Sequence, residues 1–167
     1  MPQQGFTGIL ALLERMGVRF VLIGGLAMIA HGSARITEDI DLAYSRDQDN
    51  VARLAAAMRS VRPILRGVKQ PVPSVVDERT FRNTLNLSLD TDLGPVDLLG
   101  HVAGVSSFDT LWERAVLIDV FGSPVHVASI DDLIAMKKSA GRDKDKLHEV
   151  ELRALQKLLE EEAKGER

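Results

Sequence analysis

The sequence predicts a single α/β (α+β) domain in which a mixed, twisted sheet is flanked by helices. Three observations lead to this class. The chain has 167 residues, which suits one domain with a substantial core. Its hydrophobic content of 45% is ordinary for a globular protein. Strand and helix patterns alternate early, and hairpin-spaced strands and then helices follow, as in a mixed sheet with helices packed against it. We expect residues 1–128 to form the sheet core and 129–167 a C-terminal helical extension.

Hydrophobic spacing predicts the elements of the first half of the chain. Apolar residues that recur every three or four positions indicate a helix, whereas a short apolar run or strict alternation indicates a strand. Residues 63–73 contain Pro63, Gly67, Pro71 and Pro73 and are expected to form a loop. The predicted elements are a helix over 6–13 that stops at Gly17, a strand over 18–23, a helix over 26–31, a strand over 38–44 and a helix over 47–61.

The second half is expected to hold two hairpins and three helices. Alternating leucines at 85, 87 and 89 are typical of a half-buried strand, and the turn at 90–94 leads back into a partner. Ser129 and Asp132 have the spacing of a helix cap and its first turn. The predicted elements are strands over 84–89 and 96–99, a short helix over 107–114, strands over 115–120 and 125–128, a helix over 129–140 and a final helix.

The final helix is expected to begin with Asp143 as its cap. Its apolar residues recur at helical spacing, and we expect this stripe to pack into the core. The alternative is an interaction module that uses the stripe to bind a partner. The stripe consists of Leu147, Val150, Leu155, Leu158 and Leu159.

Composition excludes several classes of protein. The chain has no cysteine, so it forms neither disulfides nor a thiolate metal site, and a reducing compartment is favoured. No apolar run reaches the roughly 18 residues that span a bilayer, and the N-terminus lacks a signal layout. We therefore expect a cytoplasmic protein with no membrane partner. The formal charge of −3 argues against general nucleic-acid binding, although basic residues cluster between Arg53 and Arg82 and again between Lys137 and Lys146.

Two aspartates one residue apart are the most informative local feature. Side chains at positions i and i+2 of a strand leave the same face, so Asp39 and Asp41 would lie side by side while Ile40 and Leu42 face the core. Two carboxylates held that close repel each other unless a cation lies between them. Mg²⁺ suits such a pair and completes its shell with waters and phosphates. The pattern therefore predicts a metal–nucleotide site at an edge of the sheet.

A third aspartate, Asp97, stands between apolar neighbours in the strand over 96–99. If this strand pairs beside the one that carries Asp39 and Asp41, the three carboxylates would form a cage able to hold two metal ions about 4 Å apart. The alternative is an exposed residue that follows a turn. The aspartate pair makes us favour the site.

Gly24 and Gly25 occur where the first strand gives way to a helix. Glycine lets the backbone approach a phosphate closely. A tight turn is the alternative explanation for this pair.

These motifs together resemble the nucleotidyltransferase superfamily with the DNA-polymerase-beta-like fold. The resemblance rests on Gly24-Gly25, a helix, the Asp39-x-Asp41 pair and Asp97 on a later strand. A later stretch resembles the abortive-infection branch, the nucleotidyltransferase toxins of type IV toxin–antitoxin systems and their stand-alone relatives. That stretch reads Leu133-x-x-Met136-Lys137-x-x-x-Gly141-Arg142-x-Lys144-Asp145.

The resemblance implies a role for each matching residue. Asp39, Asp41 and Asp97 would bind Mg²⁺, with a two-metal site, and would be catalytic together with Lys137. Gly24 and Gly25 would cradle the triphosphate, and Lys137 would neutralise phosphate charge. The other implied nucleotide-binding residues are Arg35, Thr37, Lys144 and Asp145, of which Asp145 would orient Lys137 or lie near the acceptor. Without the resemblance, Arg35 could simply pair with Glu38, and Lys137 could be a surface residue.

The resemblance also implies a reaction, the transfer of an NMP from an NTP to an acceptor hydroxyl. An RNA acceptor, most simply tRNA in a toxin-like role, fits the toxin likeness and the basic segment from Arg53 to Arg82. A second possible acceptor is a partner protein, as in a minimal, antitoxin-like nucleotidyltransferase that modifies a cognate toxin. A small molecule such as an aminoglycoside is a third acceptor. A non-catalytic relative that only binds nucleotide stays open as an alternative.

Overall fold

The computed structural model describes residues 2–67 and 76–166, and side chains from residue 5 onward. Within this part of the chain, one mixed sheet has the strand order β3-β4-β5-β2-β1-β7-β6. The predicted mixed sheet is therefore confirmed. The strands are β1 (Phe20–Ile23), β2 (Ile40–Tyr44), β3 (Ile64–Leu65), β4 (Asn86–Thr91), β5 (Gly94–Leu99), β6 (Val116–Val120) and β7 (Ser123–Val127).

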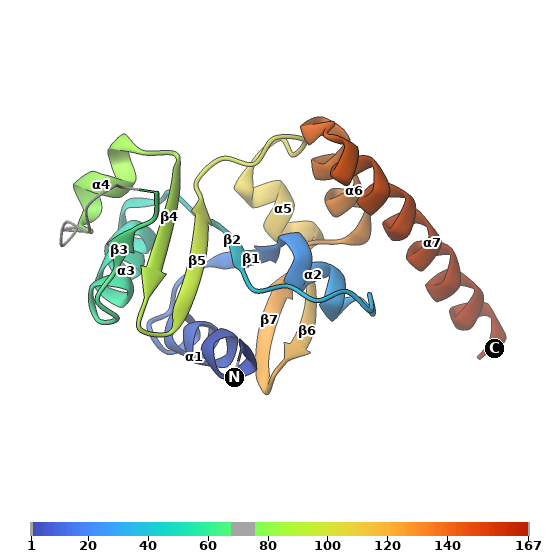
Figure 1. The fold of residues 1–167 in the computed structure, drawn as a ribbon, viewed down its shortest axis with the longest axis horizontal. Coiled ribbons are helices and arrows are strands. Elements are labelled where there is room, and N and C mark those ends of the chain that lie inside the picture. Colours follow the sequence, from blue (N-terminus) through green and yellow to red (C-terminus); the bar gives the residue numbers. More distant parts are fainter. Residues whose placement is uncertain (1, 68–75, 167) are drawn as a thin grey trace.

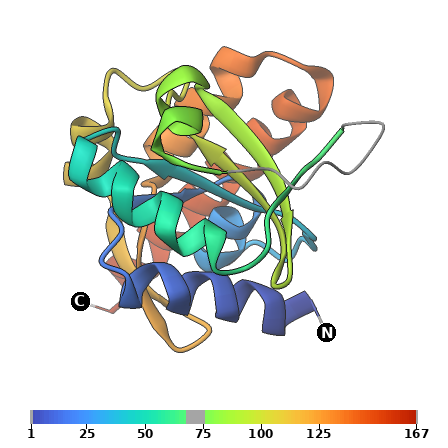
Figure 2. The ribbon, with the colours of Figure 1, turned by 90° about the vertical axis from the view of Figure 1, so that its left-hand side faces the viewer.

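Helices cover the sheet on both sides. Helices α1 and α3 lie next to each other and cover one side (Figure 2), whereas α6 and α7 lie at the end of the molecule away from α4 and β3 (Figure 1). The helices are α1 (Pro2–Arg15), α2 (Gly24–Ala30), α3 (Gln48–Arg59), α4 (Glu78–Asn83), α5 (Phe108–Arg114), α6 (Ile130–Ala140) and α7 (Asp143–Gly165).

The core forms where apolar strand residues meet the apolar faces of the helices. Central strands β1 and β2 are buried along almost their whole length, because neighbours pair with them on both sides and helices cover their faces. In α1, Ile9, Leu10 and Leu13 are fully buried, as their helical spacing predicted. This core fixes the positions of β2 and β5, which carry the candidate site. Among the described residues, no helix combines the length and the apolar character that crossing a bilayer requires.

Two expectations about the final helix are wrong. The cap of α7 is Arg142, and Asp143 is already the first helical residue. The predicted core stripe faces solvent instead, since Leu147 is 72% exposed and Val150 is 67% exposed. Leu152, outside the predicted stripe, is fully buried and anchors α7. The stripe was misassigned because apolar residues occur on two faces of α7, which packs against α6 and runs outward from the sheet (Figure 1).

The predicted loop over 63–73 is partly structured. Ile64 and Leu65 form β3, which pairs antiparallel with β4 at the edge of the sheet. A two-residue strand leaves almost no periodic signal in a sequence, which explains why the prediction missed it. Pro71, Pro73 and the basic residue Lys69 lie outside the described residues.

We expect the stability of the protein to depend on the inner face of α7. Leu152→Ala should lower the free energy of unfolding by about 2–5 kcal/mol, the usual cost of truncating a buried leucine. Leu147→Ala, the matched control on the exposed face, should change it by no more than about 0.5 kcal/mol. Urea unfolding followed by circular dichroism measures both values. Equal effects of the two substitutions would contradict the placement of α7.

Candidate active site

The site begins with the register of three neighbouring strands. Strand β2 runs antiparallel to β1 and parallel to β5, so Asp41 lies opposite Ile23 on one side and opposite Asp97 on the other. Residues that are direct partners across a sheet carry their side chains on the same face. The expected convergence of Asp97 with Asp41 is therefore present. Asp39 comes just before β2 begins at Ile40, and it is exposed at the mouth of the site.

Gly24 makes room for the carboxylate of Asp41. Its φ of +70° lies in the left-handed region, and a Cβ atom at this position would clash with Oδ2 of Asp41. Any other residue would therefore strain the backbone and displace the central carboxylate. Gly25 has a similar relation to Thr37, because a Cβ atom on Gly25 would lie 3.2 Å from Oγ1 of Thr37. That hydroxyl also accepts a hydrogen bond from the backbone N–H of Asp39, at 3.4 Å.

The three carboxylates are electrostatically coupled. The pKa of Asp41 rises from 3.8 to about 7, chiefly because its carboxyl is buried and next because the negative charge of Asp97 lies beside it. The charge of Asp39 raises this pKa further, and the charge of Lys137 opposes the rise. Burial and the neighbouring negative charges both disfavour the ionised form of Asp41, and a cation bound nearby would relieve this cost.

A second wall of the site comes from the junction of α6 and α7. Gly141 ends α6 with a φ of +66° and lets the chain turn sharply into α7. Nζ of Lys137 lies 3.5 Å from Oδ1 of Asp145, and Nε of Arg142 lies 2.6 Å from Oδ2 of the same carboxylate. The hydrogen bond from Arg142 is the main reason why the pKa of Asp145 falls to about 2. The buried, ionised Asp145 therefore holds two cations at the edge of the cavity.

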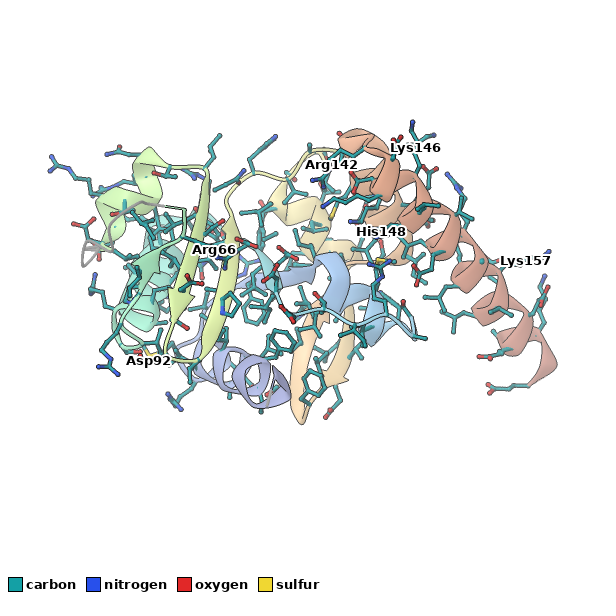
Figure 3. All side chains as sticks on the ribbon, viewed as in Figure 1. Arg66, Asp92, Arg142, Lys146, His148 and Lys157 are labelled. Atoms are coloured by element: carbon teal, nitrogen blue, oxygen red, sulfur yellow. The ribbon has the colours of Figure 1, made fainter. Side chains whose placement is uncertain are left out.

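The central strands β2 and β5 and the α6–α7 junction line a cavity of about 480 Å³, a volume in the range of small-molecule sites. Most of the predicted site residues line it. In Figure 3, Arg142 and His148 approach from the α6–α7 side, and Arg66 comes from the opposite side, near β4 and β5. The predicted residues that line the cavity are Gly24, Gly25, Asp39, Asp41, Asp97, Lys137, Lys144 and Asp145.

Two predicted nucleotide-binding residues do not line this cavity. Arg35 neither lines it nor pairs with Glu38; its guanidinium donates to Oε2 of Glu151 in α7, at 3.1 Å. The alternative pairing was wrong because α7, more than a hundred residues later in the chain, folds back onto this loop. Thr37 lies behind Gly25 and Asp39 rather than in the cavity wall.

Sequence reasoning missed three residues of the site. Arg142 belongs to the motif from Leu133 to Asp145, but the resemblance assigned it no role. His148 lies one helical turn after Asp145, a spacing that places both on one face of a helix and could have revealed it. Arg66 donates to Oδ1 of Asp97 at 3.3 Å. No local signal predicts this contact, because it depends on the pairing of β3 with β4.

The donor set of the site suits a hard divalent cation. Asp39, Asp41 and Asp97 line the same cavity, and carboxylate oxygens are the ligands that Mg²⁺ prefers. Within residues 2–67 and 76–166, no three metal-ligating side chains are already arranged as a closed binding cluster. Asp41 and Asp97 are direct partners across β2 and β5, and Asp39 lines the same cavity.

Comparisons with known proteins agree with this architecture. The description "Nucleotidyl transferase AbiEii toxin, Type IV TA system" belongs to a family model that matches residues 11–148. The solution structure of the antibiotic-resistance factor ANT(2'')-Ia is similar at 13% identity with a TM-score of 0.52, covering 98% of this chain and 97% of that one. A crystal structure of TM1012 from Thermotoga maritima is similar at 17% identity with a TM-score of 0.51, covering 93% and 91%. No curated protein sequence matches the chain.

The fold and the family match together define an enzyme of the nucleotidyltransferase type. The chain belongs to the AbiEii family of nucleotidyltransferase toxins of type IV toxin–antitoxin systems, since the family model covers most of its length. The resemblance that the sequence motifs indicated is confirmed.

The raised pKa of Asp41 predicts a characteristic pH dependence of stability. Between pH 3.8 and about 7 the folded protein keeps a proton on Asp41 that the unfolded chain releases. In EDTA, wild-type stability should therefore lose this contribution as the pH rises through that window. Asp41→Asn cannot ionise, so its stability should exceed that of wild type increasingly toward about pH 8. Urea midpoints that differ by a constant amount at every pH would contradict the coupling.

Proposed function

We propose that the protein is a Mg²⁺-dependent nucleotidyltransferase that moves an NMP from an NTP to an acceptor hydroxyl and releases pyrophosphate. The observation that carries this proposal is the direct pairing of Asp41 with Asp97 across β2 and β5, on a cavity that also contains Asp39 and Lys137. Bound Mg²⁺ would polarise the α-phosphate and lower the pKa of the acceptor hydroxyl.

The residues of the chain divide this work. Asp39, Asp41 and Asp97 would hold the metal, and the absence of side chains at Gly24 and Gly25 would let the triphosphate lie against the backbone. Thr37 would act indirectly, because its hydroxyl hydrogen-bonds to the backbone of Asp39 and so helps to position that carboxylate.

Positive charge for the phosphates would come from the α6–α7 wall. Lys137 is largely buried, and Asp145 restrains its ammonium group, so little further entropy is lost when it meets a phosphate. It would stabilise the charge that develops on the leaving pyrophosphate. Lys144 lines the same cavity, is exposed, and would contact the outer phosphates. Arg35 would act structurally, by fastening α7 through Glu151.

We infer an RNA acceptor, most simply tRNA, in a toxin-like role. The support is the family, which consists of type IV toxins. The basic segment offers fewer side chains for RNA phosphates than the sequence indicated. Arg62 is paired with Asp92, and Arg66 is paired with Asp90 and Asp97. Arg59 and Arg79 are two of the exposed arginines of this segment that would contact phosphates. A partner protein as acceptor, in an antitoxin-like role, is the second candidate, and its motive is the same toxin–antitoxin context.

Labelling with each α-³²P NTP, Mg²⁺ and total RNA or lysate tests the chemistry. Wild type should label an acceptor with one or more NTPs, whereas Asp39→Ala and Asp97→Asn should lower the rate by at least about a hundredfold, because the metal ligands act in the transition state. Asp92→Asn serves as the control, since Asp92 is an exposed acid of the β4–β5 turn outside the cavity. Identical labelling by wild type and Asp39→Ala would contradict the proposal, and tight NTP binding without turnover would favour a non-catalytic relative.

The acceptor is tested separately from the chemistry. Arg59→Ala together with Arg79→Ala should reduce RNA labelling severalfold and make it less sensitive to salt, because two phosphate contacts are lost. Labelling of a purified protein acceptor should not change. Arg66 is unsuitable for this test, because its substitution would also disturb Asp97. RNA labelling that is unaffected by the double substitution would exclude this surface as the RNA site.

A further inference from the structure

The guanidinium of Arg66 stands directly behind the third carboxylate of the site. Its Nη1 donates to Oδ1 of Asp97 at 3.3 Å, and its Nε donates to Oδ1 of Asp90 at the same distance. Its Nη2 donates to the backbone carbonyl of Leu89 at 3.1 Å. Three donors of one planar group are thus committed to three acceptors on β4 and β5, which leaves the side chain little freedom to rotate.

We propose that Arg66 is a positioning residue for the metal site, which fixes the carboxylate of Asp97 in the orientation needed to bind a divalent cation. This inference rests on the proposed function. Arg66 binds one oxygen of Asp97, which leaves the other oxygen available to a metal on the face that Asp97 shares with its strand partner Asp41. Groups that hydrogen-bond to metal ligands commonly determine how well those ligands bind.

A cation so near a metal site could instead repel the metal. Asp90 argues against this, because its carboxylate does not line the cavity and pairs with Arg66 at 3.3 Å. The Arg66–Asp90 pair therefore presents an oriented donor with little net charge to Asp97. Such a neutral pair repels a metal ion only weakly, because its electrostatic effect falls off quickly with distance. The hydrogen bond from Arg66 still fixes the orientation of the Asp97 carboxylate.

The position of Arg66 in the chain supports the same role. Its backbone N–H donates to the carbonyl of Ser88 at 3.0 Å, so the residue is tied to β4 directly after β3 ends. Ser88 is the partner of Asp97 on β5. The short edge strand β3 thus fastens Arg66 at the register position from which its side chain reaches Asp97.

The test is direct binding of Mn²⁺, which takes the same oxygen ligands as Mg²⁺ and whose free form is counted by electron paramagnetic resonance. No nucleotide is added, so the readout does not depend on activity. Arg66→Ala should weaken Mn²⁺ binding by between about tenfold and a hundredfold. Arg66→Lys should restore part of the affinity, because an ammonium group can bind Asp97 but cannot hold all three acceptors.

Arg62→Ala is the matched control, since Arg62 lies on the same segment and pairs only with the exposed turn residue Asp92 among the described residues. It should bind Mn²⁺ like wild type. Urea unfolding in EDTA checks that each variant is folded, and if Arg66→Ala does not fold, weaker binding by Arg66→Lys carries the test. If the folded Arg66 variants bind Mn²⁺ as tightly as wild type or more tightly, the inference about Arg66 is overturned and the proposed function is not. A wild-type protein that binds no Mn²⁺ would overturn the proposed function as well.

Discussion

The parallel register between β2 and β5 is the constraint on which the rest of the site depends. It pairs Asp41 with Asp97 across the centre of the sheet, far from either edge. A shift of one residue would turn one of these carboxylates to the opposite face. Buried apolar neighbours prevent that shift, because Ile40, Leu42, Val96 and Leu98 would then lose their places in the core. The energy of hydrophobic packing thus holds two like charges together.

Charge balance explains the arrangement around the paired carboxylates. Two cations of the site are each held by a further acid: Arg66 by Asp90, which does not line the cavity, and Lys137 by the buried Asp145. These secondary acids keep the cations ordered without consuming the carboxylates of the site. One pair comes from α6 and α7, and the other joins β4 to the residue that follows β3, so elements distant in sequence complete the site (Figure 3).

Local patterns were sufficient to predict the mixed sheet and most strand and helix positions. They placed Asp39 inside a strand over 38–44, whereas β2 begins at Ile40 and Asp39 comes just before it. The sequence predicted that Asp97 joins the other two aspartates only if its strand pairs with theirs, because a sequence does not reveal which strands are neighbours. Contacts of long range were missed or wrong for the same reason, as with Arg35 and Glu151 or Arg66 and Asp97. The outer leucines of α7 misled the prediction because periodicity shows an apolar face without showing what covers it.

The most direct test of the central claim is a crystal structure of the wild-type protein with Mn²⁺ and a non-hydrolysable NTP, using the anomalous signal to locate the metal. We predict a manganese peak bound by Asp41 and Asp97 together, with Asp39 as a further ligand and the triphosphate beside Gly24 and Gly25. A nucleotide bound elsewhere, or metal bound without Asp97, would contradict the account.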